Sequence, residues 1–62
     1  MRRWTWKLTI TTNREEVDFV GESLADESAT GKSILPGILR DVASNNPHLK
    51  NGRVTSFEAK RD

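Results

Sequence analysis

Residues 4–11, WTWKLTIT, alternate strictly between apolar and polar side chains. The apolar positions are Trp4, Trp6, Leu8 and Ile10, and the polar positions are Thr5, Lys7, Thr9 and Thr11. A period of two residues, in a run rich in aromatic and β-branched side chains, predicts a β-strand with one buried face. This pattern constrains the fold strongly, because a shift of one residue would turn every apolar side chain toward water.

The next residues predict a return strand and therefore a β-hairpin. TNRE, residues 12–15, forms the expected turn, and EVDFVGES, residues 16–23, forms the second strand. With Thr11 placed opposite Glu16, Trp6 faces Gly21, where an aromatic ring can cover the backbone that glycine leaves bare. The same register gives the pairs Ile10–Val17, Leu8–Phe19, Thr9–Asp18, Lys7–Val20 and Thr5–Glu22. Apolar groups then share one face of the hairpin.

A helix is expected after this hairpin. Apolar side chains recur every three or four residues, at Ile34, Leu35, Ile38, Leu39, Val42 and Ala43. Pro36 is tolerated only near the start of a helix, so we expect Ser33 to be the N-cap and to accept the N–H of Leu35. Asn46-Pro47 should end the helix between Ser44 and Asn46.

Gly31-Lys32-Ser33 matches the end of the phosphate-binding loop of nucleotide-hydrolysing enzymes. That loop requires a glycine five residues before Gly31, where this chain has Asp26. Asp26 and Glu27 would repel a polyphosphate, and 62 residues are too few for the βαβ layers of such a site. We therefore interpret these residues as the start of the helix.

The C-terminal residues predict a third strand, Val54 to Ala59. Asn51-Gly52 tolerates positive φ and favours a tight turn before it. Val54 and Phe57 have opposite parity, so one of them is expected to face away from the helix. A short hairpin with Leu49 opposite Val54 is an alternative, which leaves residues 47–54 as either a loop or a hairpin.

These elements predict an α+β fold with the order β-β-α-β in a single domain, residues 1–62. A right-handed crossover places the third strand beside the first, antiparallel to it, in the strand order 2-1-3. The helix should cover the face that carries Trp4 and Trp6. The other face of the three-stranded sheet is left open to solvent or to a partner.

Charge and composition limit the classes of function that this chain can have. The net charge is +1, but residues 1–14 are basic, residues 15–27 acidic and residues 28–62 basic again. The chain has no cysteine and no apolar run that suits a signal peptide or a membrane span, so we expect a cytoplasmic protein without a membrane partner. A domain this small, without disulfides, is often completed by a second copy of itself.

The sequence offers no catalytic constellation, so we expect a protein that is not an enzyme and has no small-molecule substrate. His48 is the only histidine and is interpreted as an exposed residue near the helix C-terminus. Glu16, Asp18 and Glu22 alternate along one strand face, which indicates a solvated acidic face more than a cation site. No metal ligand set and no cofactor are expected.

Two functions remain. The first is a regulatory or interaction protein that binds through its open sheet face or a strand edge, and that self-associates as a homodimer. Its expected partner-binding residues are Val20, Glu16, Asp18, Glu22 and Lys7. The alternative is nucleic-acid binding, because arginines neutralise phosphates and aromatic rings stack on unpaired bases. Its expected residues are Arg2, Arg3, Lys7, Lys60 and Arg61, although Trp4 and Trp6 are in phase with the core.

Overall fold

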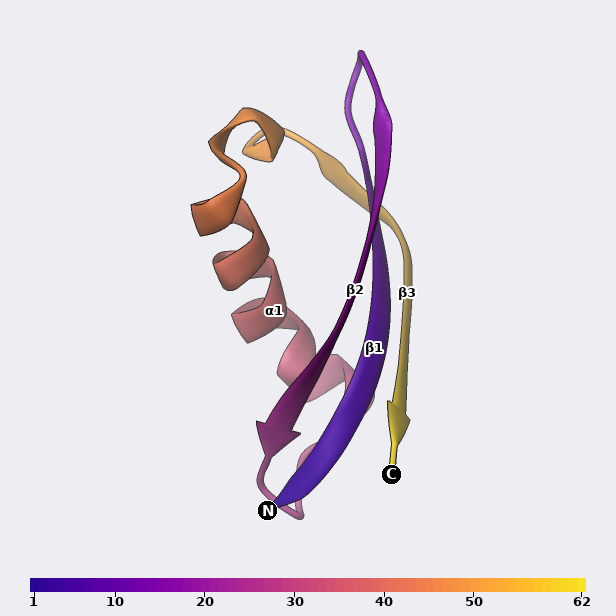
Figure 1. The fold of residues 1–62 in the computed structure, drawn as a ribbon, viewed down its shortest axis with the longest axis vertical. Helices are drawn as coiled ribbons and strands as arrows, with labels where there is room; N and C mark the ends of the chain where they lie inside the picture. The colour runs from indigo at the N-terminus through magenta and orange to yellow at the C-terminus, as the bar shows by residue number, and fades with distance from the viewer.

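The protein folds as a three-stranded antiparallel sheet with one helix against one face (Figure 1). The structure is a computed structural model that describes residues 1–62. Its elements are β1 (Arg2–Thr11), β2 (Glu16–Ala25), α1 (Gly31–Asn45), the short 3₁₀ helix η1 (Pro47–Leu49) and β3 (Arg53–Arg61). The strand order is β2-β1-β3, which confirms the predicted fold class and places the tryptophan-bearing strand in the centre.

The hairpin register is the one that the two-residue alternation predicts. Thr11 lies opposite Glu16 and Trp6 opposite Gly21, and the pairing continues to Arg2 and Ala25. The Trp6 ring covers Gly21 so closely that a Cβ on this glycine would lie 2.5 Å from Cζ2 of the ring. The indole Nε1 donates a hydrogen bond of 3.0 Å to Ser23 Oγ, which holds the ring over the return strand.

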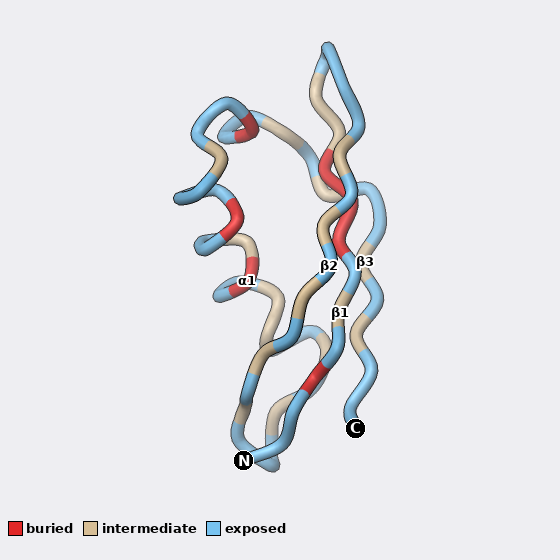
Figure 2. The backbone as a smooth tube through the Cα atoms, viewed as in Figure 1, coloured by how far each residue is buried: buried red, intermediate tan, exposed pale blue.

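The core lies between the sheet and α1. Figure 2 shows buried positions on β1, on α1 and in η1, whereas the ends of the sheet are exposed. Leu8 is fully buried, and the core cluster also contains Ile10, Ile38, Val42 and Leu49. Trp4 is buried outside this cluster, close to Gly31 at the start of α1. Only seven of the 62 residues are buried, so the core is small for the length of the chain.

The start of α1 differs from the prediction. Thr30, not Ser33, is the N-cap, and the helix begins at Gly31. The N–H of Ser33 donates to Thr30 Oγ1 at 3.2 Å, and the N–H of Thr30 donates to Ser33 Oγ at 2.8 Å. This capping box stabilises an additional stretch of helix before Pro36, which lies inside the helix at the cost of one missing N–H donor. The helix ends at Asn45, which confirms the end predicted from the Asn46-Pro47 pair.

A β-bulge corrects the expected orientation of the third strand. Thr9 lies opposite Ser56, but Ile10 lies opposite Val54, so Thr55 is the extra residue on β3. The bulge reverses the parity of the strand, and both Val54 and Phe57 pack against the core. The prediction that one of them faces away from the helix is therefore wrong.

The connection from α1 to β3 is neither a hairpin nor a positive-φ turn. Residues 47–49 form η1, and Leu49 is buried in the core, so the alternative with Leu49 opposite Val54 is wrong. Gly52 does not have a positive φ. Glycine is required there by close packing, because a Cβ would collide with Ile10 Cγ2 and lie 3.0 Å from the Leu49 carbonyl oxygen.

We expect Gly21→Val to destabilise the fold, because its side chain would occupy the space of the Trp6 ring. Overpacking of this kind costs about 1–3 kcal/mol, which thermal or denaturant unfolding measures directly. The penalty should shrink in a Trp6→Leu background, where the ring is absent. An equal penalty in both backgrounds would show that the ring is not the cause.

Gly52→Ala and Gly37→Ala should change stability in opposite directions. Gly52 has no room for a Cβ, so its replacement is expected to cost about 1–3 kcal/mol. Gly37 lies inside α1 with nothing within 4 Å of a new Cβ, so alanine should stabilise the helix by about 0.5–1 kcal/mol. Denaturant melts of the two variants beside wild type make the comparison. Equal effects would contradict the packing described for residue 52.

Candidate interaction surface

The sheet face opposite α1 is uncovered, and we call it the open face. Its residues follow from the strand registers. They are Arg3, Thr5, Lys7, Thr9 and Thr11 on β1; Glu16, Asp18, Val20, Glu22 and Leu24 on β2; and Arg53, Ser56, Glu58 and Lys60 on β3. All five predicted partner-binding residues, Val20, Glu16, Asp18, Glu22 and Lys7, therefore share this face.

Two large apolar side chains are exposed on the open face. Val20 is 74% exposed and Leu24 is 66% exposed. They project from the same side of β2, with Glu22 between them. The prediction included Val20 but missed Leu24, although the same two-residue period that places Val20 on this face also places Leu24 there.

Charges of both signs surround these apolar groups. Lys7 lies between Val20 and Glu58 in the sheet register, and Thr5 lies between Glu22 and Lys60. The side chains of Lys7, Glu22, Glu58 and Lys60 form no ion pair within the chain, whose two pairs are Arg3–Asp62 and His48–Glu15. These charges are therefore free to meet a partner.

A shallow hollow of about 400 Å³ lies on the same face. Thr5, Lys7 and Val20 line it from β1 and β2, and Glu58 and Lys60 line it from β3. Next to it, the hydroxyl of Thr9 is buried and donates a hydrogen bond of 2.7 Å to Asp18 Oδ1. The open face thus has a shallow hollow beside the exposed apolar side chains of β2.

The structure does not bring the residues expected to bind nucleic acid together into one cluster. Lys7, Lys60 and Arg3 lie on the open face, whereas Arg2 and Arg61 have the opposite parity; Arg2, Arg3 and Arg61 are all at the end of the sheet near both chain termini. Arg3 Nε donates to Asp62 Oδ2 at 2.8 Å, and this hydrogen bond, with the attraction of Asp62 and Glu22, raises the pKa of Arg3.

The two tryptophans lie on the helix side of the sheet. Trp4 is buried, with no hydrogen-bond partner for Nε1, and the Nε1 of Trp6 is bonded to Ser23. Their rings therefore do not lie on the same face as Lys7 and Lys60.

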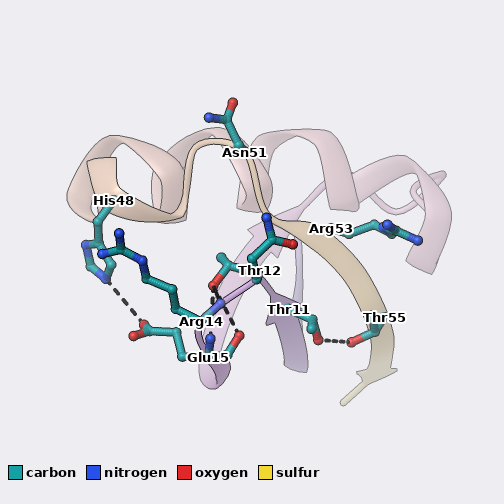
Figure 3. A pocket seen from close by; sticks show the side chains of 9 residues that line it. Thr11, Thr12, Arg14, Glu15, His48, Asn51, Arg53 and Thr55 are labelled. Carbon is teal, nitrogen blue, oxygen red and sulfur yellow. Dashed lines mark hydrogen bonds and ion pairs between the residues drawn. The ribbon is translucent and has the colours of Figure 1, made fainter.

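A second, larger hollow of about 580 Å³ lies at the end of the hairpin (Figure 3). Residues 11–15 line it together with His48 and Asn51 from the α1–β3 connection and Arg53 and Thr55 from β3. The sequence alone predicted no such site. His48, expected to be an exposed residue near the helix C-terminus, is exposed in η1 with Nε2 3.7 Å from Glu15 Oε1.

The chain contains no group of three or more histidine, aspartate or glutamate side chains that could hold a metal ion. None of its helices has the length and apolar character that crossing a membrane requires. No protein-family model, curated protein or solved structure matches the chain.

Thr12 holds the hairpin turn beside the larger hollow. Its Oγ1 accepts the N–H groups of Arg14 at 3.2 Å and Glu15 at 3.1 Å, and donates to the Glu15 carbonyl at 3.3 Å. We expect Thr12→Val to lower the free energy of unfolding by about 0.5–1.5 kcal/mol, the usual net value of one such bond. Ser44→Ala is the control, because the Ser44 side chain is exposed on α1 outside the open face and makes no hydrogen bond, and it should change stability by less than about 0.5 kcal/mol. Equal denaturation midpoints for the two variants would contradict this role for Thr12.

Proposed function

We propose that this protein is a non-enzymatic interaction module that pairs with a second copy of itself through the open face. The observation that carries the proposal is the exposure of Val20 and Leu24 on one sheet face, among charges of both signs without partners. The same proposal includes a regulatory role, in which the open face is either exposed or covered. It also includes a cytoplasmic location.

The solvent-accessible area of the single chain is larger than that expected of a complete folded monomer. The single chain exposes 4742 Å², whereas a folded monomer of its mass is expected to expose about 4,000 Å². The excess is close to the roughly 800 Å² that each partner contributes to an interface of standard size. The radius of gyration, 11.8 Å, also exceeds the roughly 10.6 Å expected for this length. One copy thus leaves uncovered about as much surface as a dimer would bury.

The charge pattern suits a two-fold pairing of open faces. In such a dimer the same patch meets itself, so every contact occurs twice. The acidic side chains of β2 in one copy can approach Lys7 and Lys60 of the other, while Leu24 enters the partner's shallow hollow. Opposite charges of this kind contribute orientation and register more than affinity. Burial of the exposed apolar groups of both copies supplies the driving force.

Pairing through the edges of β2 is a weaker alternative. An antiparallel register with Val20 opposite Leu24 of a second copy would place Glu22 directly opposite its own copy. A register with Val20 opposite Val20 would place Asp18 opposite Glu22. Like charges directly opposite one another destabilise paired strands, and charged residues along an edge strand discourage edge pairing. The acidic residues of β2 therefore favour contact through the face.

We expect wild-type protein to have twice the 7.0 kDa chain mass in sedimentation or light-scattering measurements at micromolar concentration. Replacing Val20 and Leu24 by lysine removes two buried apolar groups per copy and adds like charges. This change should weaken association about a hundredfold or more, since each buried side chain contributes roughly 1.5–3 kcal/mol.

Ala43→Lys is the matched control, because Ala43 is exposed on α1 and lies outside the open face. This variant should remain dimeric, and circular dichroism should show that both variants are folded. A monomeric wild type at high micromolar concentration would refute self-association. A dimer that survives both lysine substitutions would place the interface elsewhere.

A further inference from the structure

The larger hollow, at the hairpin end, is lined entirely by polar and charged side chains. Its volume of about 580 Å³ falls within the range of small-molecule sites, roughly 300–1,000 Å³. Such sites are usually lined by apolar and aromatic side chains, but this one has no apolar lining residue. The polar and charged groups of this lining favour a ligand that carries charges and hydroxyls over a purely aromatic or aliphatic one.

Two arginines without ion-pair partners give the hollow its charge. Arg14 and Arg53 line it, and neither has a carboxylate within ion-pair distance. The one carboxylate of the lining, Glu15, lies 3.7 Å from His48. Guanidinium groups match phosphate oxygens with two parallel hydrogen bonds, so these arginines suit an anionic phosphate.

The arginines lie at opposite ends of the hollow. In Figure 3, Arg14 is on the side of His48 and Glu15, whereas Arg53 is on the side of Thr11 and Thr55 and points away from Arg14. The two guanidinium groups therefore do not converge on one point. The geometry instead fits an elongated ligand with one anionic group at each end.

Hydroxyl and amide groups lie between the two charged ends. Thr11 Oγ1 and Thr55 Oγ1 are 3.0 Å apart, and since one hydroxyl donates to the other, the second keeps its hydrogen for a ligand. Asn13 also lines the hollow, and its side-chain amide forms no hydrogen bond within the protein. Asn51 lines it as well, but its side chain points away from the other lining residues in Figure 3. The threonine hydroxyls and the Asn13 amide can bind the hydroxyls of a sugar or polyol.

We propose that this hollow binds a small polyhydroxylated molecule with a phosphate at each end, of the sugar bisphosphate class. Arg14 binds one phosphate, Arg53 binds the other, and the threonine hydroxyls and the Asn13 amide bind the hydroxyls between them. The Thr12-anchored turn positions Arg14. The β-bulge at Thr55 positions Arg53 and the paired threonines. This site adjoins the open face proposed for self-association and shares Thr11 and Arg53 with it, but it does not include Val20 or Leu24.

The test compares fructose 1,6-bisphosphate, fructose 6-phosphate and fructose, titrated into the full chain at about 0.15 M ionic strength. Amide NMR shifts or calorimetry give the affinities. We expect the bisphosphate to bind roughly tenfold or more tightly than the monophosphate, because a second charge-assisted contact is made. Free fructose should bind more weakly than either.

Arg14→Ala and Arg53→Ala should each weaken bisphosphate binding to about the level of the monophosphate. Arg40→Ala is the matched control, because it removes the same charge from an exposed position on α1 outside the hollow. It should leave the affinity within about twofold of wild type. The amide spectra of the three variants also report whether each is folded.

Several results would overturn the proposal. These are the absence of saturable bisphosphate binding up to about 10 mM, equal affinities for bisphosphate and monophosphate, and an equal loss in the Arg40→Ala control. A short single-stranded oligonucleotide is included as a competitor. If it binds more tightly than the bisphosphate and depends on the same two arginines, the hollow is a nucleic-acid contact and not a sugar bisphosphate site.

Discussion

The packing of the Trp6 ring on the backbone of Gly21 fixes the register of β1 against β2, and both faces of the molecule depend on that register. With Trp6 opposite Gly21, Leu8 and Ile10 face α1, and Lys7 and Thr9 lie on the open face. A slip by one residue would reverse this assignment along the whole strand. The hydrogen bond from Trp6 Nε1 to Ser23 Oγ fixes the orientation of the indole ring, which apolar packing alone would leave free to rotate. The same interaction thus builds the core and defines the open face.

The hairpin was predictable because its information is local. Alternation along β1, a turn and a complementary alternation along β2 lie within residues 4–23, and each agrees with the others. The orientation of β3 was not predictable in this way. Gly52 must lie against Ile10 and the Leu49 carbonyl, and the bulge at Thr55 brings Val54 and Phe57 to the same side. The contact of Gly52 with Ile10 and the pairing of Ile10 with Val54 join residues more than forty positions apart, and nothing in the parity of the strand reveals them. The helix start was missed for a smaller reason, since the reciprocal bonds of Thr30 and Ser33 outweigh the penalty of Pro36.

The two candidate sites also differ in whether the sequence could have predicted them. The open face follows from strand parity, so Val20 was found from the sequence and Leu24 could have been found by extending the same count. The hollow at the hairpin end could not, because it joins three segments whose positions depend on η1 and on the bulge. Arg14 and Arg53 look like ordinary surface arginines in the sequence. Only the folded chain shows that they lie at the two ends of one polar depression without carboxylate partners.

The small core connects the two proposals to stability. Domains of this length bury only about 60% of the surface that the unfolded chain exposes, so their stability is marginal. A second copy on the open face would stabilise the folded state by mass action and would act on the sheet. A ligand in the hollow would act at the hairpin end, where it would add to the contacts that already join the hairpin to η1 and β3. These include the Glu15–His48 contact, the Thr11–Thr55 hydrogen bond and the packing of Leu49 and Gly52 against the core. Because Thr11 belongs both to the hollow and to the open face, the two effects on the free energy of unfolding should be coupled and not simply additive.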